Sequence, residues 1–185
     1  PADRALRLVA RVRFQQLSSP TAAKSVEDTA FYRYGRLLSR NEVGSHPDQF
    51  FLSPAGFHEA CAERQRLYPG ALLATATHDH KRGEDVRMRL AVLSGIADEW
   101  AATLRGWMAE SQPLRSELES GTAPDEGEAA MLFQMLVASW PLGLSHEDRA
   151  GIDAWAERLA GWQQKAMREA KRRTDWSMPD ENYEN

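Results

Sequence analysis

A dense group of side chains that could do chemistry begins near the middle of the chain, directly after a short apolar run. The run over residues 71–77 follows a Pro-Gly pair and suits a fully buried strand, although periodicity alone does not separate so short a run from buried helix. His78, Asp79, Lys81 and Arg82 come next, and a helical apolar pattern follows them. Buried strand, polar cluster and helix in this order are typical of a (β/α)8 barrel, which carries catalytic side chains at the C-terminal ends of its strands.

The elements that would position this cluster are mainly helical. Apolar residues recur at helical spacing over residues 2–17, 22–39, 53–68, 84–93, 98–120 and 129–140, and in a long helix that follows Ser145 and reaches about Arg173. Loops are expected at 41–51 and 121–127, where turn-forming residues gather. The sequence therefore predicts a mainly α fold with at most one or two short strands.

Several residues should mark where these helices begin and end. Pro20 should end the first helix, because a proline disfavours helical geometry in the residue before it. Ser53 and Pro54 suit an N-cap and a first helical position. Pro113 should kink or break its helix. The segment that begins at Ser145 resembles a capping box.

Composition and charge exclude several classes of protein. The net charge of −4 gives no basic field that would attract nucleic acid or an anionic membrane. The single Cys61 excludes an internal disulfide framework, and the sequence shows neither a signal peptide nor an apolar run of about 20 residues. We therefore expect a cytoplasmic protein with neither nucleic acid nor membrane as a partner.

Three stretches of the chain resemble one family. These are AKSVEDTAFYRYGRLLSRNEVG at 23–44, THDHKRGEDVR at 77–87 and KAMREAKRRTDWSMPDENYE at 165–184. They strongly resemble the maltooligosyl trehalose synthase family of the α-amylase superfamily (glycoside hydrolase family 13), in long motifs that occur in the right order. Members of that family are several times longer than 185 residues. The resemblance therefore implies a fragment from the later part of such an enzyme.

The resemblance also implies an organisation for the chain. Residues 1–70 would be a helical subdomain inserted in a (β/α)8 barrel. Residues 71–97 would supply one barrel strand with its His-Asp motif and the following helix, and residues 98–176 a further helical region. Residues 177–185 look like a poorly ordered tail.

The family motifs imply roles for particular residues. Asp79 would be the carboxylate that accepts hydrogen bonds from sugar hydroxyls, and His78 would donate to the same sugar. Lys24 and Glu27 would lie against the reducing end of the sugar chain, although the residues alone indicate an ordinary solvated helical turn. Lys81 would contact the sugar on the acceptor side.

Two further residues are candidates for binding the substrate. Arg82 follows Lys81 within the second motif and is included for that reason. Tyr32 is a weaker candidate, because aromatic rings are more often core than ligand surface, but sugars present C–H faces that stack on rings. The resemblance implies neither a cofactor nor a metal.

The implied reaction is an intramolecular transglucosylation that turns the reducing-end glucose of a maltooligosaccharide into an α,α-1,1 (trehalose) end. Relatives in this superfamily cleave with retention, using a carboxylate nucleophile and a carboxylic acid about 5 Å apart. The resemblance places both before the first residue of this chain. We therefore expect the 185-residue chain to be inactive on its own and to need the missing remainder of the enzyme.

Two other interpretations stay open at this stage. An all-helical metal-dependent phosphohydrolase could use a histidine, a His-Asp pair and a later aspartate as ligands, for which His58, His78, Asp79 and Asp153 are nominal candidates. The chain could also be a helical interaction module with no chemistry of its own. Metal analysis tests the first interpretation, and maltooligosaccharide binding tests the second.

Overall fold

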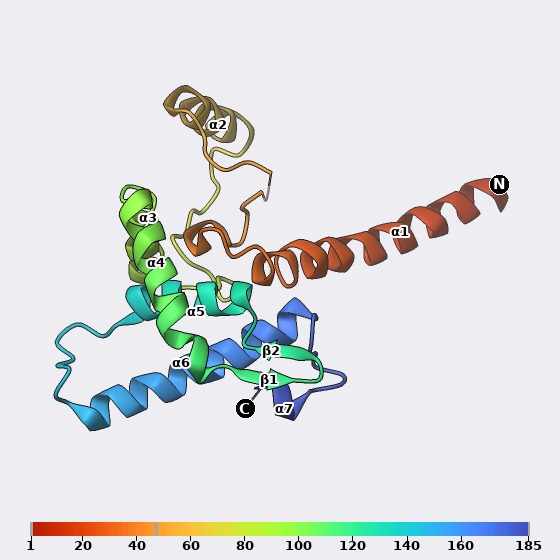
Figure 1. The fold of residues 1–185 in the computed structure, drawn as a ribbon. Coiled ribbons are helices and arrows are strands. Elements are labelled where there is room, and N and C mark those ends of the chain that lie inside the picture. The colour runs from red at the N-terminus through yellow and green to blue at the C-terminus, as the bar shows by residue number, and fades with distance from the viewer. Residues whose placement is uncertain (1, 47, 185) are drawn as a thin grey trace.

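The computed structural model describes residues 2–46 and 48–184, and it is mainly helical, as predicted (Figure 1). The elements in chain order are α1 (Ala2–Val26), η1 (Ala30–Tyr32), η2 (Leu38–Arg40), α2 (Pro54–Leu67), α3 (Glu84–Val92), α4 (Ala97–Ser111), η3 (Gln112–Leu114), β1 (Ser116–Leu118), β2 (Gly121–Ala123), α5 (Glu126–Ser139), α6 (Arg149–Ala170) and α7 (Glu181–Glu184). The two strands form one antiparallel hairpin, in which Glu117 lies opposite Thr122.

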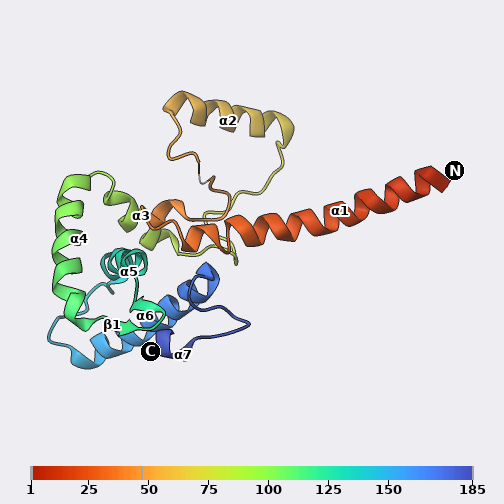
Figure 2. The same ribbon diagram turned by 45° about the vertical axis from the view of Figure 1, so that its right-hand side comes forward.

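Helix α5 lies at the centre of the main core, between α3, α4 and α6 (Figure 2). The core contains Leu38 and Leu90, which are fully buried, together with Met135 and Trp155. Burying one such side chain contributes about 1.5–3 kcal/mol. Asp125 caps α5 by accepting from the backbone N–H of Glu128, whose carboxylate accepts from the backbone N–H of Asp125. The helix expected over 129–140 is confirmed, although the capping box at Asp125 was not expected.

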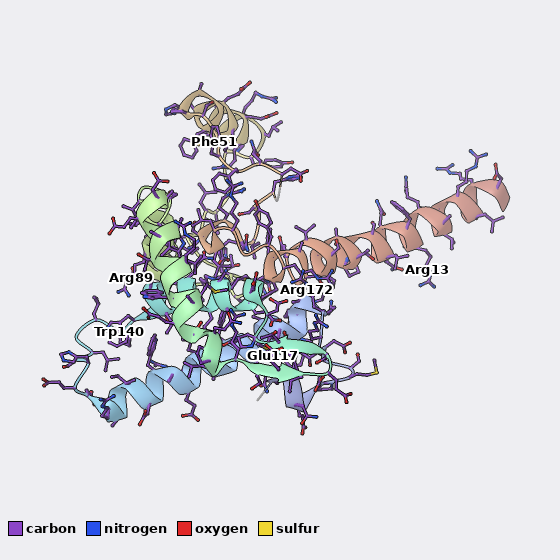
Figure 3. The ribbon with its side chains drawn as sticks, in the orientation of Figure 1. Arg13, Phe51, Arg89, Glu117, Trp140 and Arg172 are labelled. Carbon is purple, nitrogen blue, oxygen red and sulfur yellow. The ribbon has the colours of Figure 1, made fainter. Side chains whose placement is uncertain are left out.

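Helix α1 differs from the prediction of two helices separated at Pro20. It runs unbroken from Ala2 to Val26, and one-turn 3-10 helices replace the helix expected up to residue 39. Pro20 removes the backbone donor to the Gln16 carbonyl, but Gln16 is exposed, so water can take the place of that donor. The N-terminal part of α1 projects from the body of the molecule, as Figure 3 shows around Arg13.

Helix α2 begins as predicted, with Ser53 accepting from the backbone N–H of Gly56 and Pro54 in the first turn. The expectation that Phe57, Cys61 and Leu67 form a buried face is wrong, because α2 buries none of its residues. The helix stands away from the rest of the molecule on two connecting segments (Figures 1 and 2). Its apolar stripe has no covering element within the described part of the chain.

Residues 71–77 do not form the expected strand. They have no regular structure, and Leu72 and Leu73 are 99% and 72% exposed. A strand needs neighbours for its backbone N–H and C=O groups, and no other strand lies beside this segment among the described residues. The two strands of the structure lie instead in the hairpin that follows the break at Pro113.

The last two helix starts also differ in detail from the expectations. Asp148, and not Ser145, caps α6 by accepting from the backbone N–H of Gly151 at 2.9 Å. The loop expected over 121–127 is shared between β2 and the first turn of α5. The long helix itself is confirmed, with Trp155 and Leu159 buried on its core side.

The C-terminal segment is anchored, so the prediction of a poorly ordered tail is wrong for residues 177–184. Tyr183 is only 2% exposed, and its hydroxyl donates to Glu128 Oε2 at 2.6 Å. The carboxylate of Glu184 accepts from Arg168 Nε at 2.8 Å and from Gln164 Nε2 at 3.0 Å. The hydrogen bonds from Arg168, Thr174 and Gln164 hold the pKa of Glu184 below its ordinary value, although its burial acts in the opposite direction.

Replacing Glu184 with Gln is therefore expected to lower stability at neutral pH by about 1–3 kcal/mol, the usual cost of losing the partner of a buried polar group. A carboxylate with a depressed pKa stabilises the fold above its unfolded value of 4.5, and this stabilisation is lost as the pH falls through the folded value. The difference in the free energy of unfolding between wild type and Glu184→Gln should thus reach its maximum at pH 7 and vanish in acid. Urea unfolding at several pH values measures it.

The matched control for this experiment is Glu119→Gln, because Glu119 is an exposed carboxylate close to the hairpin. Burial raises the pKa of Glu128, so that group acts in the opposite direction as the pH falls. Glu128 is present in both wild type and Glu184→Gln, so its contribution cancels in the difference between their free energies of unfolding. A Glu184→Gln difference that does not depend on pH would contradict the prediction.

Candidate functional site

Two of the motifs identified in the sequence meet at Asp28. Its Oδ2 accepts from Lys24 Nζ at 2.6 Å, and its Oδ1 accepts from Lys81 Nζ at 2.7 Å. The side chain of Lys81 is only 9% exposed and that of Asp28 is 21% exposed, whereas Lys24 is open to solvent. One carboxylate thus brings together two of the predicted substrate-binding lysines.

The charges in this group reinforce one another. Burial favours the neutral form of Asp28, but the hydrogen bonds from Lys24 and Lys81 outweigh it and lower the pKa of the carboxyl. The hydrogen bond to Asp28 in turn raises the pKa of Lys24. Asp28 and Lys24 therefore stay ionised at neutral pH, and the exposed ammonium of Lys24 has donors left for hydroxyl groups.

Glu42 fixes the chain on the other side of Lys81. Its Oε2 accepts from the backbone N–H of Lys81 at 2.8 Å, and its Oε1 lies 3.7 Å from Arg82 Nη1. The Arg82 guanidinium also donates to the carbonyls of Leu38 and Asn41, at 3.4 and 3.2 Å. Burial lowers the pKa of Arg82, and the Glu42 carboxylate opposes this effect.

Arg82 and Tyr32, both predicted to bind substrate, lie in the interior. Arg82 is 6% exposed and Tyr32 is 4% exposed. The Tyr32 ring packs against Ala166 and Ala170 of α6, and burial raises the pKa of its hydroxyl to about 12. In this chain both residues support the site from behind and do not present a surface to a ligand.

Glu27 lies near the same group but is held differently. Its Oε1 accepts from the backbone N–H of Gly44 at 3.3 Å. Gly44 has a positive φ of 82°, a conformation that side-chain-bearing residues rarely adopt. This bond ties the end of α1 to the loop that carries Glu42.

His78 and Asp79 are the exposed part of the predicted site. Their side chains are 90% and 65% exposed, and His78 Nε2 lies 3.4 Å from Asp79 Oδ2. Asp79 is close enough to Lys24 to contribute to raising the pKa of that lysine. The next residue, His80, is half-buried, and its Nδ1 accepts from the backbone N–H of Thr77 at 2.8 Å. Asp79 and Lys24 are thus both exposed to solvent.

The first turn of α3 holds the segment before His78. Glu84 Oε1 accepts from the Thr75 hydroxyl at 2.6 Å, and Arg87 donates to the Thr75 carbonyl. The hydrogen bond from Thr75 is the main reason why the pKa of Glu84 is lowered. Glu84 and Asp85 lie in the first turn of α3, where the helix dipole favours acidic side chains.

Sequence reasoning missed two residues that organise this site, Asp28 and Glu42. Lys24 and Asp28 are four apart on a helix, so their pairing could have been expected from spacing alone. The pairing of Asp28 with Lys81 spans 53 positions, and no local pattern indicates it. Glu42 lies in a stretch that was expected only to be a loop.

The structure does not assemble the metal site of the alternative interpretation. Within residues 2–46 and 48–184, no three His, Cys, Asp or Glu side chains gather closely enough to hold a metal ion. His58 lies on the projecting helix α2, whereas Asp153 lies on α6. In the same part of the chain, no helix is both long and apolar enough to cross a membrane.

An apolar pocket lies elsewhere, in a groove between α4, α5 and α6. It has a volume of about 670 Å³ and is lined by Trp107, Glu110, Ser111, Leu114, Phe133, Leu136, Val137, Trp140 and Trp155. None of the predicted site residues lines it. Arg89 donates to the carbonyl of Trp140, one of the lining residues, at 2.8 Å, and Figure 3 labels both residues. The apolar lining of the pocket offers few hydrogen-bond partners, and a sugar requires such partners.

Comparison with known proteins connects the whole chain to one enzyme. A Mycobacterium tuberculosis protein named as a maltooligosyl trehalose synthase is 39% identical over 173 residues, which cover 94% of this chain and 21% of the relative. No family model matches the chain. The chain therefore spans about a fifth of the length of the curated relatives that it matches.

Solved structures agree with this match. The maltooligosyltrehalose synthase from Arthrobacter ramosus superposes with a TM-score of 0.75 at 36% identity, over 95% of this chain and 20% of the other. A Sulfolobus tokodaii structure described as a maltooligosyl trehalose synthase gives a TM-score of 0.77 at 34% identity, over 96% of this chain and 22% of the other.

Proposed function

This chain resembles one segment of the maltooligosyl trehalose synthases over nearly its whole length, and on this premise we propose that it works as part of such an enzyme. The reaction would convert the α-1,4-linked glucose at the reducing end of a maltooligosaccharide into an α,α-1,1-linked trehalose end. The proposal includes a cytoplasmic location and no cofactor.

The meeting of Lys24 and Lys81 on Asp28 is the observation that carries the proposal. The two lysines come from motifs that are far apart in the sequence, and both motifs resemble that family. The ammonium groups of Lys24 and Lys81 supply donors and the exposed carboxylate of Asp79 supplies acceptors, and a polyhydroxylated ligand requires both.

The proposed chemistry divides between this chain and the rest of the enzyme. A carboxylate nucleophile would form a glycosyl ester while a carboxylic acid about 5 Å away protonates the leaving oxygen. Both groups would lie outside these 185 residues. In the second step the anomeric hydroxyl of the released glucose attacks the anomeric carbon of the glycosyl ester, the bond from that carbon to the carboxylate oxygen breaks, and the hydroxyl proton passes to the conjugate base of the acid.

The residues of this chain would select glucose over water in that second step. Lys24, Glu27 and Lys81 would hold the released glucose while it turns its anomeric hydroxyl toward the intermediate, which is catalysis by proximity. Asp79 and His78 would bind the sugar on the other side of the bond that is broken. Arg82 and Tyr32 would act indirectly, by packing behind Lys81 and beside α6.

The organisation proposed for the complete enzyme follows the sequence expectations. Residues 1–70 would belong to a helical subdomain inserted in a (β/α)8 barrel, residues 71–97 would supply a barrel strand and its helix, and residues 98–176 a further helical region. The exposed Leu72 and Leu73 support a strand that gains its neighbours only there.

The test compares the complete enzyme that carries this sequence with the 185-residue chain, using maltopentaose and measuring trehalose-ended product and free glucose. The complete enzyme is expected to form mainly the trehalose-ended product. The chain alone is expected to form neither, because it would lack the nucleophile and the acid. Turnover by the intact short chain, with its mass confirmed, would overturn this division of roles. A complete enzyme that releases glucose alone would overturn the proposed reaction.

A further inference from the structure

We propose that Asp28 is a positioning residue that fixes the Lys81 ammonium for the acceptor sugar and sets its separation from Lys24. The inference rests on the proposed function and deepens it. Asp28 was not expected to belong to the site, and nothing in the sequence pattern alone connects it with Lys81. The reason to include it is geometric, because each of its two carboxylate oxygens is bonded to one of the two lysines.

A lysine without a carboxylate partner would orient a sugar poorly. Its four-carbon chain has many rotamers, so the ammonium of a free lysine samples a wide region. Lys81 is held at both ends, by Asp28 at Nζ and by Glu42 at its backbone N–H. An ammonium has three donors, so Lys81 can bond to Asp28 and still donate to a sugar hydroxyl.

Burial explains why an acid is needed at this position. The Lys81 side chain is 9% exposed, and an ammonium that has lost most of its water needs a compensating negative charge. Asp28 supplies that charge. A neutral residue of the same shape would keep an acceptor but not the charge, and Lys81 would then gain by turning toward solvent.

Asp28 itself is unsuited to transferring protons. Both of its oxygens accept from lysines, and these bonds keep the carboxyl ionised. Its effect on the reaction would therefore pass through the lysines, on the choice between glucose and water as the acceptor. The formation of the glycosyl intermediate needs no acceptor and should be less affected.

The first experiment measures that choice in the complete enzyme, as the ratio of free glucose to trehalose-ended product from maltopentaose. Asp28→Asn and Lys81→Ala should both raise the ratio, by up to about 10²-fold if the acceptor is misplaced by an ångström. Asp28→Glu, which keeps the charge, should recover part of the loss. Asp85→Asn is the control, because Asp85 is an exposed acid on the neighbouring turn.

The second experiment measures the position of Lys81 without using activity. The 185-residue chain is acetylated for short times, and the modified lysines are quantified by peptide mass spectrometry. Lys81 should react slowly in the wild type and severalfold faster in Asp28→Asn. Lys165, which is exposed on α6, is the internal reference. Equal rates for Lys81 in the two proteins would overturn the role of Asp28.

The outcomes separate this inference from the proposed function. If the wild-type enzyme forms no trehalose-ended product, the proposed function fails, and the acetylation result still reports whether Asp28 holds Lys81. If Lys81→Ala changes the ratio and Asp28→Asn does not, only the inference fails. A merely structural role for Asp28 predicts that both products fall together at a constant ratio, which would also overturn it.

Discussion

Replacing Asp79 with Asn in the complete enzyme is expected to lower kcat by about 10²–10³-fold, the range observed when one electrostatic contact to a transition state is removed. KM should change less, because the lost interactions matter mainly in the transition state. A carboxylate accepts strong, charge-assisted hydrogen bonds from two sugar hydroxyls, whereas an amide offers one acceptor oxygen and an NH2 group that can only donate.

The location of Asp79 makes this substitution a clean test. Its side chain is 65% exposed, and the short side-chain contact that the structure gives it is with the neighbouring His78 at 3.4 Å, so stability should change by no more than about 0.5 kcal/mol. Steady-state kinetics with maltopentaose give kcat and KM, and thermal unfolding checks the fold. Asp85→Asn again provides the control. An unchanged kcat in folded Asp79→Asn enzyme would remove Asp79 from the substrate site.

Helices with a continuous apolar stripe were predictable from the sequence. The periodic residues of α3, α5 and α6 gave nearly the right bounds, because these helices bury that stripe against one another. The residues at which the helices begin were less predictable. Both Ser145 and Asp148 are suitable capping residues, and only the packed position of α6 selects Asp148.

Burial was the least predictable property of the fold. An apolar stripe indicates that a helix has a face to cover, but not that the covering element is part of the same 185 residues. Phe57 and Leu67 of α2 are exposed because no element of the described chain covers them, and the apolar run at 71–77 forms no strand because no other strand pairs with it there. Tyr183 is the opposite case, because it was expected in a poorly ordered tail and is buried. Its partner Glu128 lies 55 positions away, so no local pattern indicates the contact.

The residues of the candidate site were also only partly predictable from the sequence. The resemblance to the family identified Lys24 and Lys81, but their common partner Asp28 emerged only from the folded chain. Arg82 was predicted to meet the substrate because of its place in the motif, and the structure turns it toward Glu42 in the interior. Motifs mark which residues matter, whereas the direction of each side chain depends on contacts between distant segments.

Replacing Arg82 with Met is expected to destabilise the 185-residue chain by about 3–5 kcal/mol, which is the usual cost of breaking a buried ion pair from one side. The side chains of Arg82 and Glu42 are 2% and 5% exposed. Among the described residues, Glu42 Oε1 has no hydrogen-bond donor, so the guanidinium at 3.7 Å is its compensating charge. Methionine fills a similar volume but leaves that carboxylate buried and uncompensated.

The loss of stability in Arg82→Met should come from the uncompensated charge of Glu42 and not from lost packing. A second substitution separates these two causes. Adding Glu42→Gln to Arg82→Met removes the uncompensated charge, so the double variant should recover a substantial part of the lost stability. Arg13→Met on the projecting part of α1 is the matched control and should change the free energy of unfolding by no more than about 0.5 kcal/mol. Urea unfolding measures all four proteins. A double variant that is no more stable than Arg82→Met alone would show that the backbone bonds of Arg82 to Leu38 and Asn41 hold this loop, and not its charge.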